Sequence, residues 1–110
     1  MKYLFFLSIV TLVVVSCAPY KAITPAQADA ERMKSKFPDY DLEKLKEGKR
    51  LFEANCGNCH GLKNASKKTA EAWKPTVERM AGKINKKEEK LSAEDQALIL
   101  KYLMTYSKQD

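Results

Sequence analysis

Residues 48–60 read Gly-Lys-Arg-Leu-Phe-Glu-Ala-Asn-Cys-Gly-Asn-Cys-His. The stretch ends in two cysteines, Cys56 and Cys59, that lie three positions apart, and His60 follows them directly. This order is the signature of covalent haem attachment, in which both thiols add to the vinyl groups of one haem and the adjacent imidazole binds the iron. The motif therefore predicts that Cys56 and Cys59 form thioether bonds to a single haem c and that His60 is the proximal iron ligand.

Three other interpretations of the cysteine pair compete with haem attachment. A thioredoxin-like redox pair needs a βαβ setting, but no segment of the sequence alternates with the period of a strand. A tetrahedral zinc site needs a fourth protein ligand, whereas the chain has one histidine and only Cys17 as a further cysteine. A structural disulfide between Cys56 and Cys59 is the simplest alternative.

The hydrophobic pattern around the motif is helical throughout. Asp39 or Asp41 can cap a first helix, whose apolar stripe consists of Leu42, Leu45, Gly48, Leu51 and Phe52. A short second helix is expected around residues 72–81, with Pro75 in its first turn, where a missing N–H is tolerated. A third helix begins at Ser92 with a capping-box sequence, and its stripe consists of Leu98, Ile99, Tyr102, Leu103 and Tyr106. The expected fold class is therefore all-α.

Residues 48–60, together with the segment Leu-Ile-Leu-Lys-Tyr-Leu at 98–103, resemble the first helix, the haem-binding segment and the last helix of class I c-type cytochromes. The resemblance implies a small cytochrome c fold, in which the N- and C-terminal helices cross and short helices surround covalently bound haem. In that family a glycine of the first helix meets an aromatic residue of the last, and Gly48 and Tyr102 occupy the matching positions. A residue without a side chain lets two helix backbones approach closely.

The iron in such a site needs a sixth ligand or stays open. A second histidine ligand is impossible because His60 is the only histidine of the chain. Met80 shares a helical face with Trp73, and residues 73–80 resemble a short-loop subgroup of these cytochromes in which a tryptophan precedes the ligand methionine. Met104 points away from the apolar stripe of the last helix. Met80 is therefore the predicted distal ligand, with Met104 as the alternative, and an open or lysine-filled site is also retained.

Trp73 has two possible roles beside the haem. Its indole N–H is a donor that can reach a haem propionate, and its ring is a large apolar surface that can pack on the porphyrin. The sequence does not separate these two interpretations.

The N-terminus has the pattern of an export signal. Lys2 precedes an apolar run over residues 4–15, and a small residue closes it, which is the order of a secretory signal peptide. As a helix the run is about 18 Å long, less than the roughly 30 Å of a membrane span. The residues Val-Val-Ser before Cys17 resemble the lipobox of bacterial lipoproteins, which implies removal of residues 1–16 and lipidation of Cys17. Ordinary cleavage near Ala18 is the alternative.

The chain after the signal divides into two expected parts. Residues 17–38 carry the lipidated cysteine and three of the four prolines, and they are expected to form a flexible tether. A partly ordered arm packed on the domain is the open alternative. Residues 39–110 are expected to form the cytochrome c domain. The protein is thus expected at the periplasmic or another extracytoplasmic face of a membrane, held there by its lipid anchor.

The positive charge of the chain is concentrated in one region. The whole chain carries 20 Lys and Arg against 14 Asp and Glu, and residues 61–90 alone hold nine cations and four acids. This concentration favours association with a redox partner protein that has an acidic docking surface. A solvated loop whose lysines offset the haem propionates explains the pattern equally well. Nucleic-acid binding is not expected, because the chain is exported and has no basic groove interleaved with aromatic residues.

These features predict a membrane-anchored monohaem electron carrier and not an enzyme. A filled sixth position on the iron leaves no site for substrate and lets the iron change oxidation state with little rearrangement. The alternatives are a haem subunit of a larger oxidoreductase complex and an open-site haem enzyme or gas sensor. An open-site enzyme would also need a distal acid–base residue, and no second histidine is present to supply it.

Overall fold

The computed structural model describes residues 20–57, 62–88 and 90–109. They form the helices α1 (Gln27–Arg32), α2 (Leu42–Asn55), α3 (Ala70–Lys87) and α4 (Ala93–Thr105), with 3₁₀ turns η1 (Met33–Ser35) and η2 (Ala65–Lys67). Within the described ranges there is no strand, only an isolated bridge between Thr69 and Lys108. The predicted all-α fold class is confirmed.

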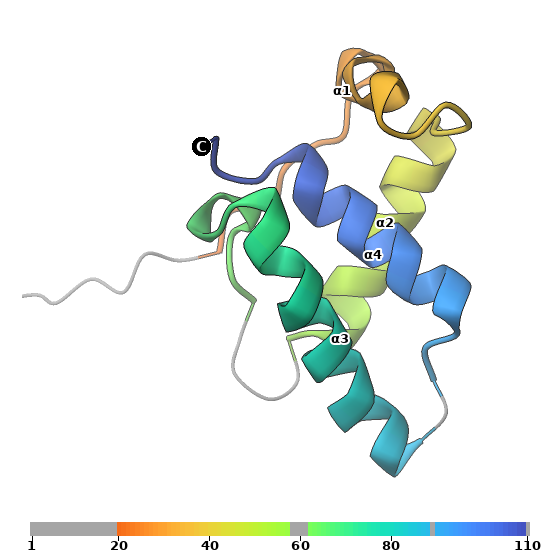
Figure 1. Ribbon diagram of the computed structural model, residues 1–110, viewed down its shortest axis with the longest axis vertical. Helices are drawn as coiled ribbons and strands as arrows, with labels where there is room; N and C mark the ends of the chain where they lie inside the picture. The colour runs from red at the N-terminus through yellow and green to blue at the C-terminus, as the bar shows by residue number, and fades with distance from the viewer. Residues whose placement is uncertain (1–19, 58–61, 89, 110) are drawn as a thin grey trace, which may run out of the picture.

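The crossing of α2 and α4 forms the centre of the fold (Figure 1). Gly48 is buried in this crossing, and a Cβ atom added to it would lie against the backbone carbonyl oxygen of Leu98 and 2.9 Å from the Cβ of Tyr102. The Tyr102 ring in turn packs on Phe52, with 5.6 Å between the ring centroids. The expected approach of Gly48 to Tyr102 is therefore confirmed, and the missing side chain is what allows it.

Both of these helices begin at the predicted caps. The Asp41 Oδ1 atom accepts a hydrogen bond of 2.8 Å from the Lys44 backbone N–H at the start of α2. At the start of α4, Ser92 and Asp95 form a reciprocal capping box. Such caps satisfy backbone N–H groups that have no partner within the helix.

Helix α3 is longer than the helix that was expected over residues 72–81. It begins after Thr69, whose hydroxyl oxygen accepts a hydrogen bond of 3.3 Å from the Ala72 N–H, and it runs to Lys87. Pro75 consequently lies in the second turn, so its predicted place in the first turn is wrong. The ring removes the hydrogen bond to the carbonyl of Glu71, but that residue is exposed and water can bind the free oxygen.

Residues 17–38 are expected to form a flexible tether, but in the structure residues 20–38 pack on the helices as an ordered arm. Ala30 is fully buried and Met33 is 6% exposed, because this arm covers the far end of α4. Two long-range contacts hold it there: the Tyr106 hydroxyl donates to Asp29 over 2.8 Å, and the Arg32 guanidinium donates to the Thr105 carbonyl over 3.2 Å. The retained alternative, an ordered arm, is the correct one for these residues, while residues 17–19 lie outside the described ranges.

None of the helices in the described part of the chain is both long and apolar enough to cross a membrane.

The hydrogen bond between Tyr106 and Asp29 predicts a pH-dependent contribution of the arm to stability. Burial alone would raise the pKa of Asp29, but the hydrogen bonds from Tyr106 and Arg32 outweigh it and lower the pKa. A lowered pKa in the folded state means stability that is present above the unfolded pKa of about 3.9 and is lost as the pH falls further. Tyr106→Phe should therefore cost about 1–2 kcal/mol at neutral pH and less at acid pH, where the Asp29 carboxylate becomes protonated.

Chemical denaturation of the variant at several pH values measures this effect. Ser107→Ala is the matched control, because the Ser107 hydroxyl donates to the Met104 carbonyl over 2.9 Å and no titrating group takes part. Its cost should not change with pH in the acid range. An equal cost of Tyr106→Phe at both pH values would contradict the role given to the Asp29 carboxylate.

Candidate haem site

A cavity of about 910 Å³ opens beside the C-terminal end of α2 and along α3. Its apolar wall is formed by Phe52, Trp73, Met80 and Ile84, together with Cys56. Cavities of about 300–1,000 Å³ with mostly apolar walls are typical sites for drug-sized ligands and cofactors. The fold therefore provides space for a large cofactor between α3 and the C-terminal end of α2, where Cys56 lies.

Cys56 is placed by the end of α2. It is the C-cap of that helix, its backbone N–H donates to the Phe52 carbonyl over 2.9 Å, and its side chain lines the cavity. The residue is only 8% exposed, and burial raises the pKa of the Cys56 thiol to about 11. The free thiol is therefore protonated at neutral pH. Cys59 and His60 lie outside the described residues, as does Cys17, so their roles stay predictions.

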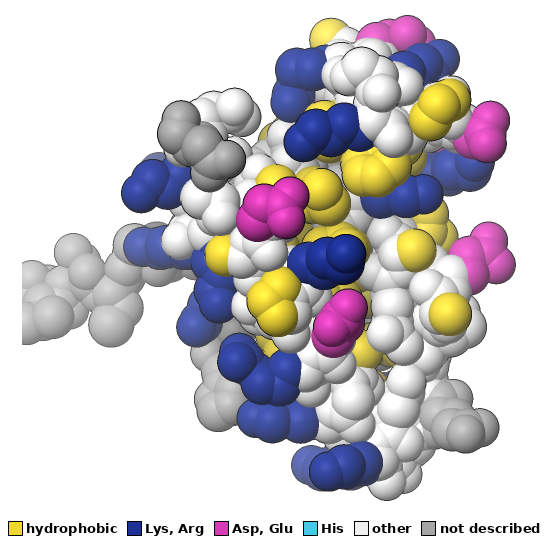
Figure 2. Space-filling view, viewed as in Figure 1, with side chains coloured by type: hydrophobic (Ala, Val, Ile, Leu, Met, Phe, Trp, Pro, Cys, Tyr) yellow, Lys and Arg dark blue, Asp and Glu magenta, His cyan; other side chains and the backbone are white. Residues whose placement is uncertain are grey.

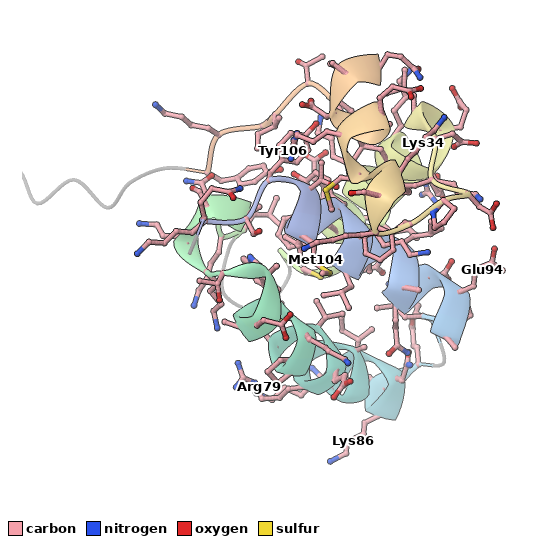
Figure 3. All side chains as sticks on the ribbon, turned by 45° about the horizontal axis from the view of Figure 1, so that its top comes forward. Lys34, Arg79, Lys86, Glu94, Met104 and Tyr106 are labelled. Atoms are coloured by element: carbon pink, nitrogen blue, oxygen red, sulfur yellow. The ribbon has the colours of Figure 1, made fainter. Side chains whose placement is uncertain are left out.

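The two candidate distal methionines lie in different places. Met80 is half-buried on α3 and lines the same cavity as Cys56. Met104, labelled on α4 in Figure 3, lines a separate cavity of about 290 Å³ together with Arg32 and Met33. The structure thus places Met80 and Cys56 of the motif along one cavity, and it places the alternative methionine beside the N-terminal arm.

Trp73 is 1% exposed, and its indole N–H donates to the backbone carbonyl of Ala65 over 2.7 Å. A donor engaged in this way is not available to a haem propionate, so that interpretation is at odds with the structure. The ring also lines the cavity, which leaves the second interpretation, contact with the porphyrin, as the prediction for Trp73. The hydrogen bond fixes η2, which follows the haem motif, to the first turns of α3.

The sequence of this region matches one known family. Residues 43–103, more than half of the chain, match the family described as cytochrome C oxidase, cbb3-type, subunit III. The chain belongs to this family. The match supports a class I c-type cytochrome and implies a covalently bound haem c. No curated protein and no solved structure matches this cytochrome significantly.

The residues of the cavity fit a haem. The residues that line the wall include two with sulfur-containing side chains, Cys56 and Met80, and two aromatic residues, Phe52 and Trp73, which are residue types that a porphyrin bound through thioethers needs. The mouth offers cations for the propionates. In this cytochrome Cys56 would hold the cofactor at the end of α2, and Met80 would approach it from α3.

The rim of the cavity is strongly cationic. Seven of the nine cations of residues 61–90 line it, and among the described residues that line it Glu88 is the one acidic residue. These cations are Lys63, Lys68, Arg79, Lys83, Lys86, Lys87 and Lys90. Arg79 and Lys86 extend from α3 away from the helix bundle (Figure 3), and Figure 2 shows the dark blue side chains gathered along the side of the molecule that α3 covers. The cytochrome therefore has a positive surface around the opening of its candidate haem site.

Sequence reasoning missed two polar features of this site. The Lys68 ammonium donates to the Thr76 hydroxyl over 2.9 Å and lies 5.6 Å from the centre of the Trp73 ring, so it braces the cavity wall. Asn85 closes the turn after α3, because its side-chain oxygen accepts from the Leu91 N–H over 3.0 Å. No local sequence pattern predicts either contact, because each depends on how the chain just before or just after α3 lies beside that helix.

Proposed function

We propose that this cytochrome is a monohaem electron carrier held to a membrane by a lipid on Cys17. In this proposal Cys56 and Cys59 would form the thioether bonds, and His60 and Met80 would be the protein ligands of the iron. The observation that carries the proposal is the position of Met80, which lines the same cavity as Cys56, while Met104 lines another.

The bound haem supplies a one-electron couple, and the residues of the chain set the conditions under which it works. The α2–α4 crossing and the hydrogen bond from Trp73 to Ala65 hold both sides of the cavity in fixed positions. Met80 on α3 would be an iron ligand in both oxidation states, so electron transfer would need little rearrangement of the chain. Phe52 and Trp73 exclude water from the apolar wall, and the lysines at the mouth offset the propionates.

The cationic rim supports the proposal that the redox partner has an acidic docking surface. Lys83, Lys86 and Lys87, here called the rim triple, are exposed on the last turns of α3 and have no ion pair among the described residues. Charges of one sign around the opening of a redox site accelerate encounter with an oppositely charged partner and orient it. In this proposal the electron enters or leaves the domain at this edge.

Oxidation of the ferrous holoprotein by a small anionic oxidant tests the exit route. Neutralising the rim triple to glutamine should slow the bimolecular reaction with hexacyanoferrate(III) roughly 3- to 10-fold at low ionic strength, and high salt should remove the difference. The same change at Lys34, Lys44 and Lys46, on the arm and α2, is the control and should have a smaller effect. Equal effects of the two triples would contradict electron exit at the rim.

A haem subunit of a larger oxidoreductase is the second candidate, and the family match to an oxidase subunit favours it. Mild purification of the native protein from its membrane distinguishes the free carrier from the complex subunit. A stoichiometric partner that persists through several steps would support the subunit, whereas isolation of the single chain supports the carrier.

A further inference from the structure

Three segments that are far apart in the sequence meet where the described chain begins. The Lys21 N–H donates to the Asn64 side-chain oxygen over 2.9 Å, and the Lys67 N–H donates to the Asn64 carbonyl over 3.0 Å. The Lys108 N–H donates to the Lys68 carbonyl over 2.9 Å. These bonds place Lys21, Lys67 and Lys108 on one side of the domain, which we call the N-terminal face.

The N-terminal face is positively charged and accessible. All three of its lysines are exposed, and none of them takes part in an ion pair between described residues. On the neighbouring elements, Glu53 is paired with Lys49 at 3.6 Å, and Glu71 is exposed in the first turn of α3. None of the three lysines lines the haem cavity, so this face is distinct from the rim triple, although the rim cations Lys63 and Lys68 adjoin it in the chain.

The ordered arm brings this face close to the predicted lipid anchor. Cys17 lies four residues before Lys21, and a fully extended chain of that length reaches at most about 14 Å. Residues 20–38 are packed on α2 and α4 and do not add to this length, so the link between Cys17 and the domain is short. Electrostatic attraction to a charged surface extends over about 8–10 Å at moderate ionic strength. A lipid on Cys17 would therefore keep the N-terminal face within reach of the headgroups.

We infer that the N-terminal face lies on the membrane and binds anionic lipid headgroups through Lys21, Lys67 and Lys108. The inference rests on the proposed lipid anchor and adds an orientation to it. Helix α3 begins beside this face, next to η2 and the C-terminal residues, and runs away from it (Figure 1). Its 18 residues span about 27 Å, so the rim triple at its far end points away from the membrane and stays free for a redox partner.

Binding to vesicles tests this inference with the haem-loaded chain. The variant Cys17→Ser, exported with a signal peptide whose cleavage does not need lipidation and which replaces residues 1–16, removes both the lipid and the apolar run and leaves the charged surface as the only contact. It should bind vesicles of equal parts phosphatidylglycerol and phosphatidylcholine and should not bind phosphatidylcholine alone. Changing all three lysines of the N-terminal face to glutamine should weaken the partition coefficient roughly 100-fold, because each lysine near an anionic surface contributes about fivefold.

The rim triple changed to glutamine is the matched control, since it removes the same charge from the other end of α3. It should weaken vesicle binding less than about threefold. An equal loss in both variants, or binding to phosphatidylcholine alone, would overturn the inference. A loss confined to the rim triple would instead mean that the haem edge faces the membrane.

Two further measurements separate failure of this inference from failure of the proposed function. The intact mass of protein extracted from membranes shows whether Cys17 carries lipid, and the optical spectrum shows whether haem and its ligands are in place. Lipidated protein with a normal spectrum and charge-independent vesicle binding would overturn the orientation alone. Protein without lipid on Cys17 would overturn the anchor, whatever the vesicles show.

Discussion

The Gly48→Ala variant is expected to lose about 3 kcal/mol or more of folding stability, because no space exists for a single methyl group at this position. The added Cβ would press on the backbone carbonyl oxygen of Leu98 and would lie 2.9 Å from the Cβ of Tyr102. Neither atom belongs to a flexible side-chain end, so α2 and α4 would have to move apart. That movement would loosen the packing of Phe52, which also forms part of the cavity wall.

Gly82→Ala is the control that isolates this steric effect. Gly82 is exposed in the middle of α3, and a Cβ added to it meets nothing within 4 Å. Alanine is the better helix former, so this change should stabilise the protein by about 0.5–1 kcal/mol. Denaturant unfolding of both haem-loaded variants should thus give effects of opposite sign. A stabilising effect of Gly48→Ala would contradict the close crossing of the two helices.

The second large effect is expected from Met80→Leu. Leucine has nearly the volume of methionine but no sulfur, so the cavity wall should keep its packing while the iron loses its proposed distal ligand. The ferric holoprotein should lose the weak far-red absorption expected for a thioether bound to iron, and its reduction potential should fall, because methionine ligation raises it. The covalent haem and the helix content should be unchanged.

Met104→Leu is the matched control for the ligand assignment. Met104 is half-buried on α4 and lines the cavity beside Arg32 and Met33, so its replacement should leave both the far-red absorption and the potential unchanged. The reverse outcome, with the band lost in Met104→Leu and kept in Met80→Leu, would overturn the assignment of Met80.

The central helices could be predicted from the sequence because their signals are local. The stripes of α2 and α4 follow helical spacing, Asp41 and Ser92 are strong caps, and Gly48 indicates a close approach. The start of α3 was placed too late because Pro75 was expected in the first turn of the helix, whereas the Thr69 cap and the buried face of the helix outweigh the one lost hydrogen bond.

The N-terminal arm could not be predicted, since its order depends on distant partners. Helix α1 has only six residues and would not be stable alone. It is held by contacts such as Tyr106 to Asp29, which join residues 77 positions apart and leave no periodic pattern in the sequence.

The candidate haem site likewise has some features that could be predicted from local sequence and others that depend on distant partners. The haem motif could be read from residue types and spacing, and the density of cations in residues 61–90 indicated a basic region. Met80 was chosen from its helical face and from the family resemblance, and its role as a ligand stays a prediction. The partner of the Trp73 indole could not be predicted, because a backbone carbonyl such as that of Ala65 has no residue signature. The position of the rim also depends on how α3 lies against the cavity, which the sequence does not specify.

The most direct test of the central claim is the optical absorption spectrum of the purified ferrous protein before and after addition of carbon monoxide. The claim is that Met80 fills the sixth position of a single covalently bound haem and that the protein carries electrons. The spectrum should then be that of six-coordinate low-spin iron, and carbon monoxide should leave it unchanged on the time scale of mixing. Rapid and complete formation of a carbon monoxide adduct would contradict the claim, because it would show an open iron suited to an enzyme or a gas sensor.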